Sequence, residues 1–189
     1  MDIEFDKASQ RLKYRQLRDD FVGSLSDATK SLAFSRIPSP LKALLGPGKI
    51  LAGYIAKDAE ADPSSILSEA HQTGCKIALP HVTGRSTPMR FLRWTPGEPL
   101  IPGPFGLLQP SGDSEICRPD VALVPLVAFD SRLNRLGQGA GHYDRALSIL
   151  ENTAAVGLAW SVQLAPALIA DPWDVPLDAV LTEKSWISL

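Results

Sequence analysis

The sequence predicts a three-layer α/β sandwich with a largely parallel central sheet, formed as a single domain over residues 1–189. Short apolar segments alternate with helical segments, an order typical of parallel sheets covered by helices. The run VALVPLVAF at residues 121–129 is almost continuously apolar, as expected of a strand buried on both faces. A chain of 189 residues is long enough for one substantial core and rather short for two.

The first expected element is a helix over about residues 5–25, in which apolar residues recur at intervals of three and four. This apolar stripe consists of Tyr14, Leu17, Phe21 and Leu25. A second row beside it consists of Arg11, Arg15 and Arg18.

The remaining elements follow from short apolar runs bounded by turn residues. Strands are expected over residues 49–56, 76–79, 90–94, 121–129, 154–160 and 178–181, and helices over residues 64–73 and 142–150. Pro125 weakens the fourth strand because proline cannot donate a hydrogen bond to a sheet. The long connection over residues 95–119 is rich in Pro and Gly, which is typical of functional or poorly ordered loops.

Composition excludes several classes of protein. The net charge of −2 provides no general field for nucleic acid or an anionic membrane, so an anionic ligand needs a local basic cluster. No apolar run approaches the roughly 20 residues that span a bilayer, and the amino terminus lacks a signal core. Cys75 and Cys117 show no metal or disulfide spacing, which predicts buried free thiols. We expect a cytoplasmic monomer or small homo-oligomer that binds neither nucleic acid nor membrane.

The segment NRLGQGAGHYDR at residues 134–145 carries the strongest functional signal. Gly137, Gly139 and Gly141 let the backbone turn sharply, so that several N–H groups can surround an anion at the start of a helix. The spacing matches neither the dinucleotide-binding fingerprint nor the P-loop. The glycines alone fit a phosphate-binding loop and a bare turn equally well, whereas the flanking Arg135 and Arg145 favour phosphate.

Acidic residues provide candidate magnesium ligands and a candidate catalytic group. Asp144 lies early in the expected helix, where it either holds Mg²⁺ or interacts with the helix dipole. Asp174, in the turn DPWDVPLD, is either a second metal ligand or a capping residue. Glu60 follows the first strand, where open sheets present ligands, although loop acids are often only solvated.

The basic row has two interpretations as well. Arg11 and Arg15 could reach the phosphates of a nucleotide, or the row could be an ordinary solvated helix face. Tyr143 could contact a ring or serve packing alone. No nucleophile elbow, HExxH motif or catalytic triad is present, and phosphoryl transfer requires none of them.

Taken together, these segments resemble the 5-formyltetrahydrofolate cyclo-ligase family over nearly the whole chain. The most specific part is VPLVAFD at residues 124–130, followed by the segment 134–145. Further similar segments are Tyr54 with EAD at 60–62, LPHV at 79–82, MRF at 89–91, GPFG at 103–106, DVPLD at 174–178 and TE at 182–183.

The resemblance implies an ATP-dependent and Mg²⁺-dependent ligase of one-carbon metabolism that converts 5-formyltetrahydrofolate to 5,10-methenyltetrahydrofolate through a phosphorylated formyl group. The implied ATP-binding residues are Arg11, Arg15, Arg135, Leu136, Gly137, Gln138, Gly139, Ala140, Gly141, His142 and Tyr143. The implied folate-binding residues are Ile55, Glu60, Gln138, Gly139, Ala140, Gly141 and His142. Asp144 and Asp174 would hold magnesium, and Glu60, Tyr143 and Arg145 are the expected catalytic residues.

The chain departs from the family pattern at four places. The usual Lys-x-x-Leu-Arg is here Arg11-Leu-Lys13-Tyr-Arg15, so the motif could instead centre on Lys13 and Arg18. Gln109 replaces an acid, His142 stands where a tyrosine is common, and Trp173 where a histidine is common. These changes bear on substrate preference more than on the reaction class.

Two other functions remain open at this point. A folate-sequestering or nucleotide-sensing protein could keep the pocket without turnover, although the acids at Glu60, Asp144 and Asp174 favour an enzyme. A sugar-phosphate isomerase or acyl-CoA transferase on a similar sheet would need a catalytic motif that the sequence does not contain.

Overall fold

The computed structural model describes residues 6–189, in which helices and short strands alternate. The helical elements are α1 (Lys7–Ser24), α2 (Asp27–Leu32), α3 (Ser39–Lys42), α4 (Ser64–Gln72) and α5 (His142–Leu147), with 3₁₀ turns η1 (Pro104–Gly106) and η2 (Ser161–Gln163). The first strands are β1 (Ile50–Ala52), β2 (Lys76–His81), β3 (Arg90–Trp94), β4 (Ile101–Pro102), β5 (Leu108–Gln109) and β6 (Ile116–Cys117). The later strands are β7 (Val121–Pro125), β8 (Ala128–Asp130), β9 (Arg135–Leu136), β10 (Ala154–Leu158), β11 (Leu164–Ala165), β12 (Ala179–Leu181) and β13 (Trp186–Ser188).

An eight-stranded sheet with the order β13-β12-β10-β7-β1-β2-β3-β6 forms the centre of the fold. The strands from β12 to β2 pair in parallel, with Leu51 opposite both Ile77 and Val121 in the register. The outer strands β13, β3 and β6 pair antiparallel. The predicted α/β fold with a largely parallel sheet is therefore confirmed.

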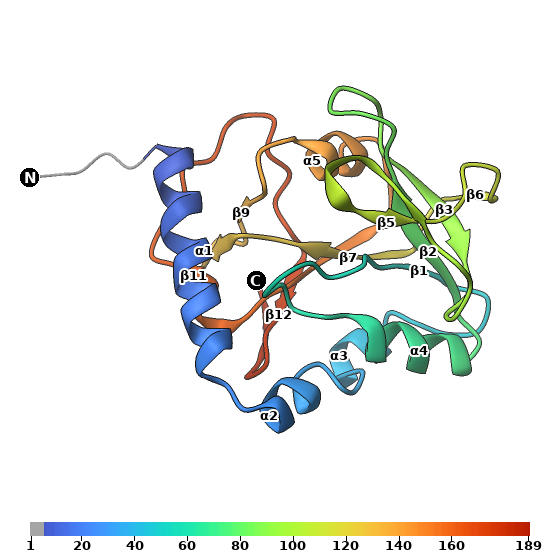
Figure 1. The fold of residues 1–189 in the computed structure, drawn as a ribbon, viewed down its shortest axis with the longest axis horizontal. Helices are drawn as coiled ribbons and strands as arrows, with labels where there is room; N and C mark the ends of the chain where they lie inside the picture. The colour runs from blue at the N-terminus through green and yellow to red at the C-terminus, as the bar shows by residue number, and fades with distance from the viewer. Residues whose placement is uncertain (1–5) are drawn as a thin grey trace, which may run out of the picture.

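Helices cover both faces of this sheet, with α3 and α4 below it and α5 above it in the view of Figure 1. Successive side chains of β1 point to opposite faces of the sheet and so belong to two different hydrophobic clusters. Leu51 packs with Ile66 of α4, whereas Ala52 belongs to the cluster that contains Leu147 of α5. Burial on both faces explains why the middle strands are apolar at nearly every position.

Helix α1 lies beside the sheet, at the left of Figure 1. It begins after Asp6, whose carboxylate accepts the N–H of Ser9 as an N-cap. Phe5, at the predicted start, lies outside the described residues. Tyr14 is buried as the stripe requires, but Leu17 is 40% exposed, so the predicted stripe is wrong at that position.

The predicted strand over residues 121–129 is in fact two strands. β7 ends at Pro125, which has no N–H to continue the ladder, and β8 pairs with β9 and β11 in a separate three-stranded sheet. The break directs the chain away from the central sheet and leads it through β9 into residues 137–141, which we call the glycine loop.

The first predicted strand, over residues 49–56, is also too long, because β1 ends at Ala52. Tyr54 leaves the sheet and its hydroxyl donates to the carbonyl of Ala61 at 2.5 Å. This bond closes a loop that carries Glu60 at the carboxyl end of β1. Smaller boundary errors occur elsewhere: β2 extends to His81, and α5 ends at Leu147, three residues before the expected end.

The long connection over residues 95–119 contains short elements that the sequence did not predict. β4 and β5 pair as a small antiparallel ribbon around η1, and β6 joins the edge of the central sheet. Cys75 and Cys117 are buried and unbridged, as predicted. Among residues 6–189, no helix has both the length and the apolar character needed to cross a membrane.

Candidate functional site

A cleft of about 1370 Å³ opens where the parallel strands β1, β2 and β7 end. Ligands of open α/β sheets bind at this edge, because loops from the carboxyl ends of the strands meet there. Its walls are α1, the glycine loop, the loop around Glu60, and residues 171–174, which we call the DPWD turn. The predicted site residues that line it are Arg11, Arg15, Ile55, Glu60, Arg135, Leu136, Gly137, Gln138, Gly139, Ala140, Gly141, His142, Tyr143, Asp144, Arg145 and Asp174.

Four cations of α1 face this cleft, and we call them the basic row: Lys7, Arg11, Arg15 and Arg18. Spacings of three and four residues place them on one side of the helix. Arg11 Nε donates to the carbonyl of Gly137 at 2.8 Å, which ties α1 to the glycine loop. The interpretation of this row as a solvated helix face is therefore wrong.

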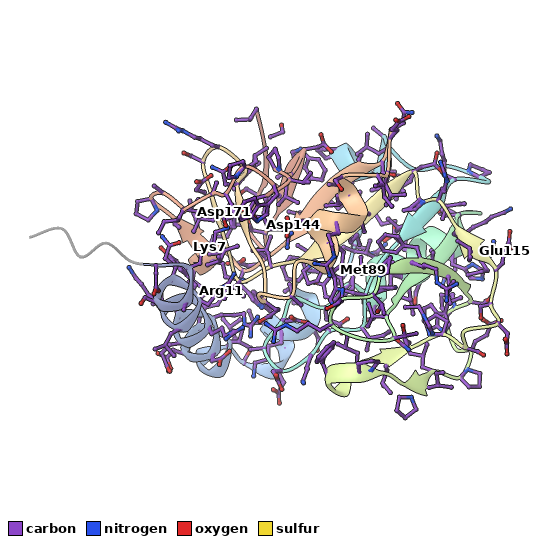
Figure 2. All side chains as sticks on the ribbon, turned by 90° about the horizontal axis from the view of Figure 1, so that it is seen from above. Lys7, Arg11, Met89, Glu115, Asp144 and Asp171 are labelled. Carbon is purple, nitrogen blue, oxygen red and sulfur yellow. The ribbon has the colours of Figure 1, made fainter. Side chains whose placement is uncertain are left out.

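The structure adds Lys7 to the site, which the sequence analysis did not identify. Lys7 lies one helical turn before Arg11 and projects toward the DPWD turn, as Figure 2 shows for Lys7 and Asp171. The basic motif could instead have centred on Lys13 and Arg18. Lys13 is exposed and does not line the cleft, so of these two residues only Arg18 belongs to the site. The feature of the sequence that indicates Lys7 as a member of the basic row is its four-residue spacing to Arg11.

The glycine loop needs its glycines for two different reasons. Gly139 and Gly141 have φ angles of +108° and +66°, which residues with a Cβ rarely adopt. A Cβ on Gly137 would lie 2.7 Å from Nη1 of Arg135. The loop therefore combines left-handed backbone with close approach of a guanidinium, and α5 begins directly after Gly141.

Several buried polar atoms around this loop have no partner within residues 6–189. They include Nε of Arg135, Nε2 of His142 and the hydroxyl of Tyr143. Buried donors without partners are costly, so their concentration at one cleft indicates that a ligand completes them. A phosphate, which carries only acceptor oxygens, matches this set of donors.

Two ion pairs occupy the end of the cleft that was predicted to bind metal. Nη2 of Arg135 donates to Oδ1 of Asp144 at 2.7 Å, and Nζ of Lys7 donates to Oδ2 of Asp174 at 2.5 Å. Burial by itself would raise the pKa of Asp174, but the hydrogen bond and charge of Lys7, the N–H of Asp171 and the charge of Arg135 together outweigh burial and lower the pKa below the usual value. Oδ1 of Asp144 also accepts the N–H of Val175, which brings the two acids to the same place.

The two acids fit a magnesium ion of the kind that substrate phosphates complete. No group of three or more His, Cys, Asp or Glu side chains suited to a metal occurs in the described part of the chain. Mg²⁺ commonly uses only one or two carboxylates together with phosphate oxygens and water. Within residues 6–189, Oδ2 of Asp144 and Oδ1 of Asp174 take part in no hydrogen bond, so each acid keeps one oxygen for a cation.

Glu60 is connected to the basic row through one side chain of the glycine loop. Nη2 of Arg15 donates to Oε1 of Gln138 at 2.6 Å, and Nε2 of Gln138 donates to Oε1 of Glu60 at 3.1 Å. The other oxygen of Glu60 accepts the N–H of Lys57. This chain of bonds orients Glu60 into the cleft and excludes the interpretation of a merely solvated loop acid.

The two tyrosines near Glu60 remain protonated at neutral pH. Burial raises the pKa of Tyr54 well above its ordinary value, and the Glu60 carboxylate adds to the effect while Arg18 opposes it. Burial and Glu60 likewise raise the pKa of Tyr143, opposed by Arg135. Tyr143 packs its ring edge-on against Phe91 at 6.4 Å, so its free hydroxyl is a fixed hydrogen-bond donor.

Arg145 and His142 support the loop from its helical side. Nη1 and Nη2 of Arg145 donate to the carbonyls of Ala140 and Arg85, at 2.9 and 3.1 Å, and Nη2 lies 3.2 Å from Nδ1 of His142. Burial, aided by the Arg145 charge, lowers the pKa of His142. Because a guanidinium only donates, Nδ1 accepts and the neutral ring carries its proton on the unpartnered Nε2.

The remaining departures from the family pattern have simple structural settings. Gln109 is buried, and its Oε1 accepts the N–H of Val82 at 3.1 Å. Trp173 is 71% exposed at the edge of the cleft. Phe105 and Leu108, from the long connection, form an apolar wall that the sequence analysis did not assign.

Comparison with known proteins gives one family. The family model described as the 5-formyltetrahydrofolate cyclo-ligase family matches residues 43–183. A 5-formyltetrahydrofolate cyclo-ligase of Escherichia coli (strain K12) is 33% identical over 144 residues, covering 72% of this chain and 79% of the relative. One from Mycolicibacterium smegmatis is 32% identical over 149 residues, covering 74% and 76%.

Solved structures agree with these sequence matches and extend over α1. An NMR structure of 5,10-methenyltetrahydrofolate synthetase from Aquifex aeolicus has a TM-score of 0.75 and 28% identity, covering 96% of this chain and 92% of that one. A 5,10-methenyltetrahydrofolate synthetase from Mycoplasma pneumoniae has a TM-score of 0.72 and 27% identity, covering 95% and 99%.

Proposed function

This chain belongs to the 5-formyltetrahydrofolate cyclo-ligase family, and from that premise we propose that it converts 5-formyltetrahydrofolate to 5,10-methenyltetrahydrofolate with ATP and Mg²⁺, releasing ADP and phosphate. The observation that carries the proposal is a cleft in which the glycine loop and its unpartnered buried donors face the basic row. The same cleft contains two carboxylates, each of which has one oxygen without a hydrogen bond among the described residues. Such an arrangement suits phosphoryl transfer, which depends on positioning and on stabilising charge.

The phosphate end of the cleft lies between Lys7, Arg11 and the glycine loop. There the backbone N–H groups at the start of α5 and the guanidinium of Arg135 would bind phosphate oxygens. Asp144 and Asp174 would hold Mg²⁺, which supplies additional positive charge against the transferred phosphoryl group. These residues act by holding the reacting atoms in line and by stabilising the charge that develops.

The folate end lies at Ile55 and Glu60, at the carboxyl end of β1. The Glu60 carboxylate would accept N–H donors of the pterin. Gln138 joins this end to Arg15, so a folate bound at Glu60 would lie directly beside the glycine loop.

The reaction needs an activated formyl oxygen, because an amide oxygen is a poor leaving group. The formyl oxygen attacks the γ-phosphorus of ATP and the bond to ADP breaks. N10 of the folate then attacks the formyl carbon, N10 loses its proton, and phosphate leaves with the former formyl oxygen as the ring closes. Tyr143 and Nε2 of His142 would donate hydrogen bonds to these oxygens, and Arg145 would hold the loop that carries them.

The direct test mixes the purified protein with 5-formyltetrahydrofolate, ATP and Mg²⁺, and follows methenyl product by its near-ultraviolet absorbance. One ADP and one phosphate are expected for each product formed, and omission of ATP or Mg²⁺ should abolish the signal. Glu60→Gln should reduce turnover. The matched control Glu115→Gln should not, because Glu115 is exposed on the side of the molecule away from Lys7 (Figure 2).

A second measurement tests the phosphorylated formyl group. With ¹⁸O in the formyl oxygen, the released phosphate should contain one ¹⁸O atom. Label appearing in water would eliminate this route. Binding of both ligands without any product would instead support a folate-binding or nucleotide-binding protein that lacks turnover.

A further inference from the structure

Arg18 is the one member of the basic row that the proposed reaction does not use. It lines the cleft, yet the residue is only 5% exposed. Its Nη1 is buried and has no hydrogen-bond partner among the described residues. Its Nε lies 3.4 Å from Oδ1 of Asp19, which is longer than a strong charge-assisted bond.

A guanidinium stays charged when it is buried, so the burial of Arg18 costs free energy until an anion pairs with it. Asp19 does not meet this need well, because its side chain is 55% exposed and contacts only Nε. The unmet requirement therefore belongs to a group that enters the cleft with a negative charge.

The position of Arg18 separates it from the phosphate end. Seven residues along α1 place it about 10 Å beyond Arg11, away from Lys7 and the DPWD turn. Phe21, three residues further along α1, packs edge-on against Trp160, and Nε1 of Trp160 donates to the carbonyl of Ala59, next to Glu60. Arg18 thus lies at the folate end of the cleft.

A folate carries negative charge only on the carboxylates of its glutamate, since the reduced pterin and the aminobenzoyl group are neutral. We propose that Arg18 binds a carboxylate of the folate's glutamate through its free guanidinium edge, and so selects glutamate-bearing substrates. This inference rests on the proposed function and adds a specificity residue to it. Arg18 is a binding residue that takes no part in phosphoryl transfer.

The experiment compares 5-formyltetrahydrofolate with 5-formyltetrahydropteroate, which lacks the glutamate. Both the KM and the equilibrium dissociation constant are measured for wild type, Arg18→Met, Arg18→Lys and the control Lys13→Met, which changes an exposed cation of the same helix. Wild type should prefer the glutamate-bearing compound about 10- to 100-fold, the scale of one charge-assisted hydrogen bond. Arg18→Met should abolish that preference, Arg18→Lys should retain part of it, and Lys13→Met should retain it fully.

Three outcomes would overturn the inference. The first is a wild type indifferent to the glutamate; this comparison needs no variant and holds even if Arg18→Met does not fold. The second is equal weakening of both folates by Arg18→Met, which would assign the contact to the ring. The third is a raised KM for ATP in Arg18→Met, which would assign the contact to a phosphate. Failure of the proposed function looks different, because wild type would then form no product from either compound while the binding comparison still tests Arg18.

Discussion

Nζ of Lys7 lies between Asp171 and Asp174, 2.6 Å from Oδ2 of the first and 2.5 Å from Oδ2 of the second. One ammonium group therefore joins the first turn of α1 to the DPWD turn, across the end of the cleft. The contact is partly buried, with 19% of the Lys7 side chain exposed.

Lys7→Met should remove this connection and leave the carboxylates facing each other without a cation. We expect the free energy of unfolding to fall by about 1–2 kcal/mol, between the values for exposed and buried charged pairs. We also expect the KM for ATP to rise, because Lys7 belongs to the phosphate end. Urea denaturation and steady-state kinetics measure the two effects. Lys49→Met, which breaks the pair with Asp120 outside the cleft lining, should reduce stability alone.

The same pair predicts a pH dependence. The pKa of Asp174 is below its usual 3.8, so its contribution to stability is complete above that pH and is lost as pH falls through the lower folded-state value. Burial tends to lower the pKa of Lys7, but its two carboxylate partners raise it above 10.5, so this contribution disappears only as pH rises through the higher folded-state value. The stability difference between wild type and Lys7→Met should be constant near neutrality and shrink in acid. A difference that persists in strong acid would contradict the ion pair.

Asp144→Asn tests the metal site and has a second consequence. The Arg135 side chain is 2% exposed, so loss of its carboxylate partner should cost about 1–3 kcal/mol of stability. The Mg²⁺ concentration for half-maximal turnover should rise more than the dissociation constant of the folate. Asp120→Asn is the control for stability without an effect on Mg²⁺. Equal loss of Mg²⁺ response and folate binding would argue against a metal role for Asp144.

Gly139→Ala should distort the glycine loop, because alanine tolerates a φ of +108° poorly. The expected result is a KM for ATP raised about tenfold or more, since misplaced N–H groups bind phosphate less well. Gly23→Ala provides the opposite case. Gly23 lies in α1, and a Cβ there would meet no atom of the described residues within 4 Å, so alanine should stabilise the protein by about 0.5–1 kcal/mol. An unchanged KM for ATP in Gly139→Ala would remove the loop from the nucleotide site.

The glycine loop was predictable because its conformation is set locally. Three glycines at alternate positions, followed by a helix, specify backbone geometry without reference to the rest of the chain. The parallel sheet was predictable for a similar reason, since residues buried on both faces must all be apolar. Pro125 correctly indicated a weak point in the strand predicted over residues 121–129. The separate sheet of β8, β9 and β11 was not predictable, because it depends on pairings between residues far apart in the sequence.

The contacts of Lys7 and the burial of Arg18 were not predictable, because both depend on how α1 is rotated against the sheet. The apolar stripe gave only an approximate rotation, and Leu17 shows its error. Lys7 finds its partners more than 160 residues away, in a turn whose acids could equally have been caps. The strands β4, β5 and β6 of the long connection were not predictable either, because they are too short to show a periodic pattern of apolar residues.

The cleft unites the first helix of the described chain with a turn close to its last strands. During synthesis on a ribosome, Lys7 and Arg11 emerge long before Asp171 and Asp174, so the phosphate end cannot close until residues 171–174 have left the exit tunnel. A nascent chain halted before residue 171 should therefore fold parts of its sheet without retaining ATP.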